Sequence, residues 1–110
     1  MSIERRTENR RMQSELNNGM KNVEIDTGAI CFRCIVCDAG NRGLGLIAGE
    51  EYHKYVIVGK KIRINFDGFH LDAEVLNTYQ SNGGNKLRFG VFLFKERQLG
   101  PYHRLFIQCE

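Results

Sequence analysis

KIRINFDGFHLDAEV, residues 61–75, contains two runs in which apolar and polar side chains alternate. Strict alternation over several residues is typical of a β-strand with one buried face. Between the two runs, Asp67-Gly68 is a favoured sequence for a tight turn that joins antiparallel strands. The stretch therefore predicts a β-hairpin that turns one face toward a core.

Similar runs lie on both sides of this hairpin. We expect further strands at residues 23–26, 30–37, 44–47 and 87–94, glycine-rich turns at 40–45 and 81–85, and a loop or weak strand at 49–57. Short strands at regular spacing, separated by such turns, favour a closed barrel or a sandwich. The sequence thus predicts an all-β domain.

The C-terminal segment has a different period. Gly100-Pro101 places a proline at a plausible first position of a helix. The apolar residues that follow recur at i, i+3, i+4 and i+7, and they are Tyr102, Leu105, Phe106 and Cys109. This spacing predicts a short helix that packs against the barrel and closes one open end.

Length and composition are those of one small domain. The chain has 110 residues, 42% of them hydrophobic, and no apolar run approaches the roughly 18 residues that a membrane span needs. Residues 1–20 are polar and aperiodic, so we expect a flexible N-terminal arm followed by the barrel and helix at 21–110. Because the N-terminus has no apolar signal region, we expect a cytoplasmic protein without membrane contact. We also expect a monomer or a weak dimer.

Three cysteines form a C-x-x-C-x-x-C pattern at Cys31, Cys34 and Cys37. On a strand, a spacing of three places successive residues on opposite faces. Cys34 is therefore expected to point away from the other two, so that one metal ion cannot bind all three. We expect reduced, buried cysteines and no metal site.

Two polar features remain. Four arginines stand close together near the N-terminus, at Arg5, Arg6, Arg10 and Arg11, in a chain whose net charge is only +3. The segment from Asp38 to Gly43 follows the apolar strand directly. Arginine binds phosphate or the O6 and N7 edge of guanine with two parallel hydrogen bonds. Aspartate accepts from the opposite edge of guanine, and glycine allows a close approach of the backbone. These features favour a guanine-containing ligand with two negative charges.

The two features together resemble the PilZ domain family, whose motifs are R-x-x-x-R and, later, [D/N]-x-S-x-x-G. Arg6 to Arg10 has the first spacing and Asp38 to Gly43 the second. Glu4-Arg5-Arg6 is similar to the family's lead-in and Gly90 to Leu93 to its last strand, so the resemblance covers roughly residues 4–108. It implies a six-stranded antiparallel PilZ-type β-barrel with a short C-terminal helix that binds cyclic di-GMP.

The resemblance also assigns residue roles. It implies that Arg6 and Arg10 hold phosphates and guanine faces with the help of Arg5, that Asp38 takes a guanine edge, and that Gly40 and Gly43 shape the turn. Gly40 stands where the family has serine. Loss of one hydroxyl hydrogen bond costs about 0.5–1.5 kcal/mol, which is up to roughly tenfold in affinity.

We therefore expect a non-enzymatic receptor that passes the binding of cyclic di-GMP to a protein partner. The three histidines are scattered and indicate no catalysis.

One alternative is an interaction module that has lost ligand binding through Gly40. Another is a small nucleic-acid-binding barrel that uses the arginine arm. We expect no DNA or RNA partner, because no surface with interleaved aromatic and basic residues is evident. Tyr79 is a weaker candidate for base contact, and Phe89, Phe92 and Phe94 are expected in the core.

Overall fold

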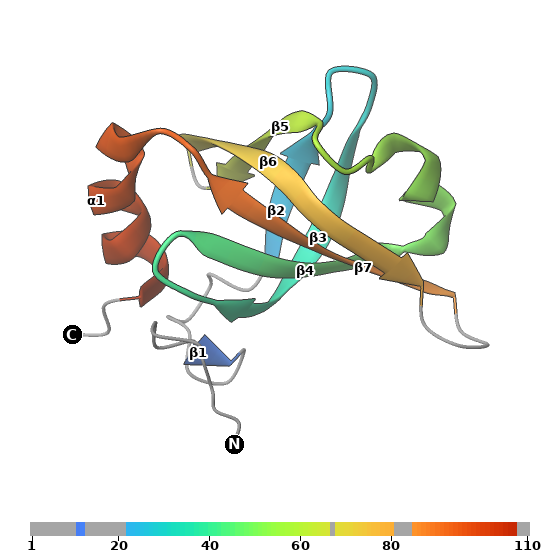
Figure 1. Ribbon diagram of the computed structural model, residues 1–110, viewed down its shortest axis with the longest axis horizontal. Helices are drawn as coiled ribbons and strands as arrows, with labels where there is room; N and C mark the ends of the chain where they lie inside the picture. Colours follow the sequence, from blue (N-terminus) through green and yellow to red (C-terminus); the bar gives the residue numbers. More distant parts are fainter. Residues whose placement is uncertain (1–10, 13–21, 67, 81–84, 108–110) are drawn as a thin grey trace.

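The computed structural model describes residues 11–12, 22–66, 68–80 and 85–107. Its strands are β1 (Arg11–Met12), β2 (Asn22–Asp26), β3 (Cys31–Ala39), β4 (Gly43–Gly49), β5 (Lys61–Phe66), β6 (Phe69–Gln80) and β7 (Lys86–Leu93). Its helical segments are η2 (Glu50–Tyr55), η3 (Glu96–Gln98), α1 (Leu99–Tyr102) and η4 (His103–Ile107). Figure 1 shows their arrangement.

Six of the strands close into a barrel. The order of neighbours is β3-β2-β5-β6-β7-β4, every pair is antiparallel, and β4 pairs again with β3. The predicted six-stranded antiparallel barrel with a short C-terminal helix is therefore confirmed. The two residues of β1 extend the sheet at β3, where Arg11 faces Ala39 and Met12 faces Asp38.

The alternating side chains fill the barrel as the sequence predicts. In the hairpin of β5 and β6, the inner positions Ile62, Ile64, Leu71, Ala73 and Val75 are all buried. Gly68 occupies the turn with a φ of 85°, a backbone conformation that glycine adopts without strain. The hairpin thus supplies five of the 21 buried hydrophobic residues described in the core.

The two ends of the barrel are closed by aromatic side chains. Tyr102 and Phe106 are fully buried at the end that α1 and η4 cover. At the opposite end, Tyr52 of η2 stacks on Phe32 with ring centroids 4.2 Å apart. Figure 1 shows these two groups of helical turns on opposite sides of the barrel. The predicted apolar stripe of the helix is thus confirmed at Tyr102 and Phe106.

Two expectations about elements are wrong in detail. Residues 50–55 form a 3-10 helix rather than a loop or weak strand. The C-terminal helix begins at Leu99, so Pro101 is not its first residue. Proline is tolerated there because the first N–H groups of a helix have no partner within it. None of the described helices is long and apolar enough to cross a membrane.

The cysteines of β3 alternate as expected. Cys34 is buried and its pKa is raised by that burial, whereas Cys31 is exposed and Cys37 is partly exposed. The expectation of buried cysteines is therefore correct for Cys34 and wrong for Cys31, which faces outward because of the strand's period. Among the described residues, no three His, Cys, Asp or Glu side chains cluster in a way that would hold a metal ion.

Candidate functional site

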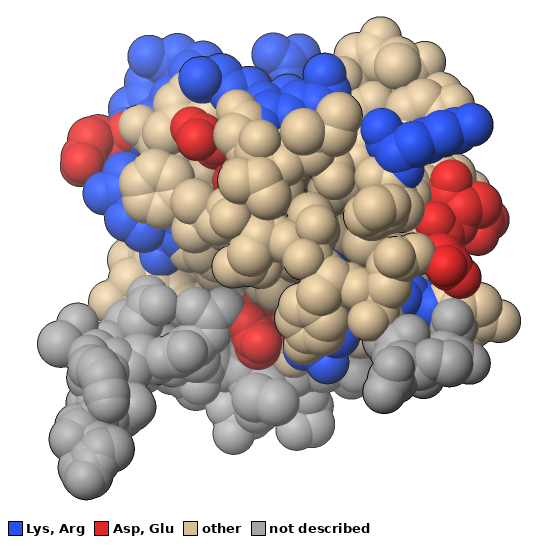
Figure 2. Space-filling model, turned by 45° about the vertical axis from the view of Figure 1, so that its right-hand side comes forward, with Lys and Arg blue, Asp and Glu red and all other residues tan. Residues whose placement is uncertain are grey.

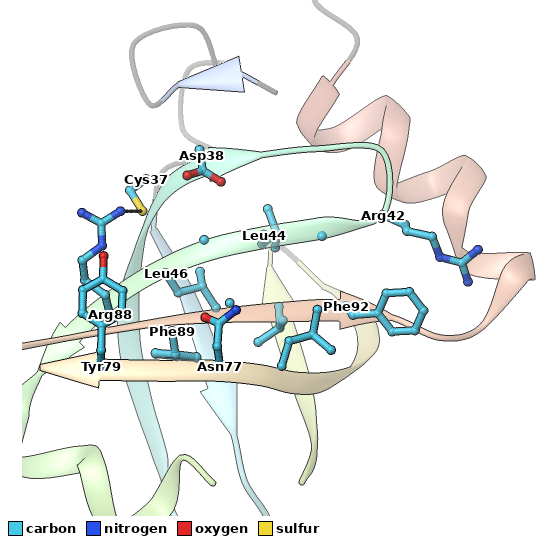
Figure 3. A pocket seen from close by; sticks show the side chains of 15 residues that line it. Cys37, Asp38, Arg42, Leu44, Leu46, Asn77, Tyr79, Arg88, Phe89 and Phe92 are labelled. Carbon is cyan, nitrogen blue, oxygen red and sulfur yellow. Dashed lines mark hydrogen bonds between the residues drawn. The ribbon is translucent and has the colours of Figure 1, made fainter. Parts of the chain in front are cut away.

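A trough of about 440 Å³ lies on the outer face of the barrel, across β3, β4, β7 and β6. That volume is within the range of small-ligand sites. Figure 3 shows its lining residues. The side chains around it include Cys37, Asp38, Arg42, Asn77, Tyr79, Arg88 and Phe92.

Glycines form the floor of this trough. The outward positions of β4 and β7 include Gly43, Gly45 and Gly90, and Gly45 pairs directly with Gly90. A Cβ atom at Gly43 would lie 3.0 Å from the carbonyl oxygen of Val91. Because these positions carry no side chains, a flat ligand can approach the backbone of two adjacent strands.

Asp38 forms one wall of the trough. The register between β3 and β4 shifts between Val36 and Asp38, so that Cys37 is an extra residue in β3. Past this bulge the carboxylate of Asp38 lies over Gly45, with Oδ1 2.9 Å from the position that a Cβ would take. Asp38 is partly exposed, and its backbone is in register with Met12 of β1 on the other side of β3. Bulges often redirect a side chain near a functional site.

The turn after Asp38 is fastened to the C-terminal helix. The N–H of Gly40 donates to the carbonyl oxygen of Gly43 at 2.8 Å. The Tyr102 hydroxyl lies 2.5 Å from the carbonyl oxygen of Gly40 and 2.8 Å from that of Gly43. His103 Nε2 is 2.6 Å from the carbonyl oxygen of Asn41. Side chains of the C-terminal helical segment therefore fix the backbone of this turn through its carbonyl oxygens.

Arg42 fixes the same turn to the end of β7. Its Nε and Nη2 donate to the carbonyl oxygen of Leu93 at 3.1 and 2.9 Å, and its Nη1 pairs with Glu96 at 3.2 Å. The guanidinium also lies 4.8 Å from the ring centroid of Phe92. Arg42 thus closes one end of the trough, with most of its donors used by the protein itself.

Arg88 closes the other end. Its Nη2 is 3.4 Å from Cys37 Sγ, and its guanidinium lies 5.9 Å from the ring centroid of Tyr79. Figure 3 shows Arg88 and Tyr79 together at the end opposite Arg42, with Asn77 across the floor from Asp38. A guanidinium has five N–H donors, so Arg88 keeps donors for an anion or a base edge.

The structure places the residues that the sequence singled out in three ways. Asp38 and Gly43 line the trough. Gly40 is buried and lies outside the lining, under the hydroxyl of Tyr102. The remaining candidates, Arg5, Arg6 and Arg10, lie outside the described residues, so their roles stay a prediction.

The sequence patterns did not identify Arg88, Asn77 or Gly90. A glycine within an apolar strand is a signal for close approach of a ligand or another backbone, and it could have indicated Gly90. Phe89 is buried as expected, but the core expectation is wrong for Phe92, which is half-buried on the outer face because residues 89, 91 and 93 take the inner positions.

Pairs of basic and aromatic side chains occur on the outer surface, contrary to expectation. They are Arg42 with Phe92, Lys54 with Tyr55, Lys61 with Phe94, and Arg88 with Tyr79. Phe94 is one of these aromatic residues and is only partly buried, so the expectation of a core position is wrong for Phe94 as well. On the face seen in Figure 2, basic side chains gather mainly along the upper edge, acidic ones lie at both sides and near the lower edge, and a largely uncharged area occupies the middle. Neither charge runs unbroken across that face.

No family model matches the chain, and no curated protein matches it. Solved structures that resemble it include two with 13% sequence identity each. One is the Bacillus subtilis inhibitor of motility (MotI/DgrA), with a TM-score of 0.65 over 90% of this chain and 48% of that one. The other is the Borreliella burgdorferi PlzA protein in complex with c-di-GMP, with a TM-score of 0.54 over 77% of this chain and 41% of that one. The chain spans less than half the length of each. These similarities support a PilZ-like fold.

Proposed function

We propose that this domain is a receptor for cyclic di-GMP and holds the ligand in the glycine-floored trough. The observation that carries the proposal is the position of Asp38 at the edge of that floor, next to the strand that follows the arginine motif. The similarity of the fold to a protein solved in complex with c-di-GMP supports it.

Each part of the trough suits one part of such a ligand. The carboxylate of Asp38 can accept hydrogen bonds from N1–H and N2–H of a guanine. The bare backbone at Gly45 and Gly90 can lie against a base or ribose. Arg88 can bind a phosphate or a base edge with its remaining donors.

The arginine motif is within reach of the same edge. Arg10 is bonded to Arg11, whose backbone pairs with Ala39 beside Asp38. Arg6 precedes Arg11 by five residues, a span of at most about 18 Å in a fully extended chain. Arg6 and Arg10 can therefore supply positive charge to phosphates in the trough, with Arg5 assisting.

The receptor would act through a protein partner. Binding would draw the arginine arm over the ligand and change the surface beside β1 and β3. A protein that contacts this surface would then distinguish the bound from the free domain. The domain itself would carry out no reaction.

Titration calorimetry of the purified chain with cyclic di-GMP tests the proposal, with GTP as the control ligand. We expect a dissociation constant in the micromolar range or below, and no comparable binding of GTP. Asp38→Ala should weaken binding about tenfold or more, because a charged acceptor for the base edge is lost. The matched control is Glu24→Ala, an exposed acidic residue of β2 outside the trough.

Two other outcomes would replace this function. Absence of heat at several hundred micromolar ligand would indicate an interaction module that does not bind the nucleotide. Binding that tolerates any single-stranded nucleic acid and weakens steeply with salt would indicate a nucleic-acid-binding barrel.

A further inference from the structure

The trough has an internal symmetry in its backbone. In β3, Val36 and Asp38 face Leu46 and Gly45 of β4, and Cys37 is the extra residue between them. In β6, Val75 and Asn77 face Val91 and Gly90 of β7, with Leu76 as the extra residue. A bulge with one extra residue, opposite an aliphatic residue and a glycine, thus occurs on both sides of the trough.

Gly45 and Gly90 are themselves paired at the centre. Because β4 and β7 run antiparallel, a half-turn about the midpoint of this pair exchanges the two strands. The same half-turn exchanges β3 with β6 in matching register, and it exchanges Asp38 with Asn77. Figure 3 shows these two side chains on opposite sides of the floor.

The two side chains also take equivalent positions. Asp38 Oδ1 lies 2.9 Å from the Cβ position of Gly45, and Asn77 Oδ1 lies 3.1 Å from that of Gly90. Each polar group therefore leans over the glycine of the neighbouring strand. A ligand made of two similar halves would meet one oxygen acceptor in each half of the trough.

We infer that Asn77 reads the second base of the bound dinucleotide, as the counterpart of Asp38. This inference rests on the proposed function, because it assumes that a cyclic dinucleotide occupies the trough. Tyr79 lies on β6, the strand of Asn77, and supplies a ring beside that half. Arg88 of β7 lies at the same end of the trough as Tyr79, with its Nη2 3.4 Å from Cys37 Sγ on the Asp38 side, and supplies a cation between the two halves.

The two half-sites differ in what they select. A carboxylate only accepts hydrogen bonds, so Asp38 requires the N1–H and N2–H donors of guanine. An amide both donates and accepts, so Asn77 can pair with guanine or with the N6 donor and N1 acceptor of adenine. The ligand class is therefore a cyclic dinucleotide with one guanine and a second purine that is selected less strictly.

Calorimetry with cyclic di-GMP, the hybrid cyclic GMP-AMP and cyclic di-AMP tests this selectivity. For the unaltered chain we expect the hybrid to bind within about tenfold of cyclic di-GMP, and cyclic di-AMP to bind much more weakly. Asn77→Asp should raise the ratio of the hybrid's dissociation constant to that of cyclic di-GMP by about tenfold, since a carboxylate cannot donate to N1 of adenine. Asn77→Leu should weaken cyclic di-GMP by about tenfold.

The control variant is Glu74→Gln, which lies on the same strand outside the trough and should change neither quantity. An unchanged ratio in Asn77→Asp overturns the inference, even if Asn77→Leu binds weakly, because a disturbed bulge alone would lower affinity without altering selectivity. Unchanged affinity of Asn77→Leu for cyclic di-GMP also overturns it and leaves the proposed function standing. Failure of the unaltered chain to bind cyclic di-GMP overturns both.

Discussion

Gly40 lies in the turn that follows Asp38, where a single hydroxyl group distinguishes this chain from the PilZ motif. It occupies the position at which the PilZ motif has serine, and its N–H and carbonyl oxygen are both used in the turn, by Gly43 and Tyr102. Among the described glycines, positive φ occurs at Gly28, Gly59 and Gly68. The backbone at Gly40 is thus not in the left-handed region, where a side chain would be strained.

Gly40→Ser should tighten the binding of cyclic di-GMP by up to about tenfold, because it adds one hydroxyl hydrogen bond worth about 0.5–1.5 kcal/mol. Gly40→Ala is the matched control, since it adds the Cβ without the hydroxyl. Titration calorimetry of both variants measures the difference. If serine binds no more tightly than alanine, the missing hydroxyl does not limit the affinity of this site.

For single residues, the sequence predicts the chemical role that a side chain suits more readily than the face of the strand on which that side chain lies. Asp38 and Gly43 stand out in the sequence because charge and conformational freedom are properties of single residues. Phe92 was misplaced because its hydrophobicity suggests a core position, whereas the register of β7 turns it outward. Asn77 carries no distinctive signal, since its role depends on a glycine in another strand.

The strands themselves follow from their alternating patterns. The hairpin of β5 and β6 was predicted from its period and its Asp-Gly turn, and its register pairs Phe66 with Phe69 as a tight turn requires. The two bulges were not predicted, because an extra residue changes which face a side chain takes without changing composition. The two bulges decide the positions of Asp38 and Asn77. The features that matter most for the site were therefore also the hardest to predict.

The C-terminal helix supports the turn that follows Asp38 through one hydroxyl. Tyr102→Phe leaves the ring in the core but removes the O–H donor that lies within 2.8 Å of the carbonyl oxygens of Gly40 and Gly43. The carbonyl oxygen of Gly43 still accepts from the N–H of Gly40, so the carbonyl of Gly40 is the group that loses its donor. A buried carbonyl without a partner costs about 1–3 kcal/mol, so we expect the free energy of unfolding to fall by about that amount. Urea denaturation followed by circular dichroism measures it.

The comparison for this variant is Tyr55→Phe, which removes a hydroxyl from a partly exposed tyrosine at the opposite end of the barrel. Its free energy of unfolding should change by less than about 0.5 kcal/mol. Equal changes in the two variants would show that the Tyr102 hydroxyl does not hold the turn.

Closure of the barrel brings the parts of the trough together. The lining residues within 37–46 are distant in the sequence from those within 76–79 and 88–92. They become neighbours only because β4 pairs with both β3 and β7. The fold class was predictable, since it needs only the spacing of strands and turns. Apart from the hairpin of β5 and β6, which its turn reveals, the neighbours of each strand around the barrel were not predictable, because the spacing of strands in one sequence does not say which distant strands pair.

At the scale of the whole molecule, we predict that the N-terminal arm becomes ordered when cyclic di-GMP binds. Fixing the backbone costs about 1–2 kcal/mol per residue, and residues 1–12 contain four arginines but no periodic apolar face. A ligand with two phosphates would add charge-assisted hydrogen bonds of about 1.5–3 kcal/mol each at Arg6 and Arg10. Amide hydrogen exchange should therefore show protection of residues 5–10 only with the ligand, while residues 61–76 change little and GTP has no effect. Arg11 is left out of this comparison because its backbone already pairs with Ala39. Equal protection of the arm in the free and bound protein would instead indicate a preformed site, and binding could then not be transmitted to a partner by ordering of the arm.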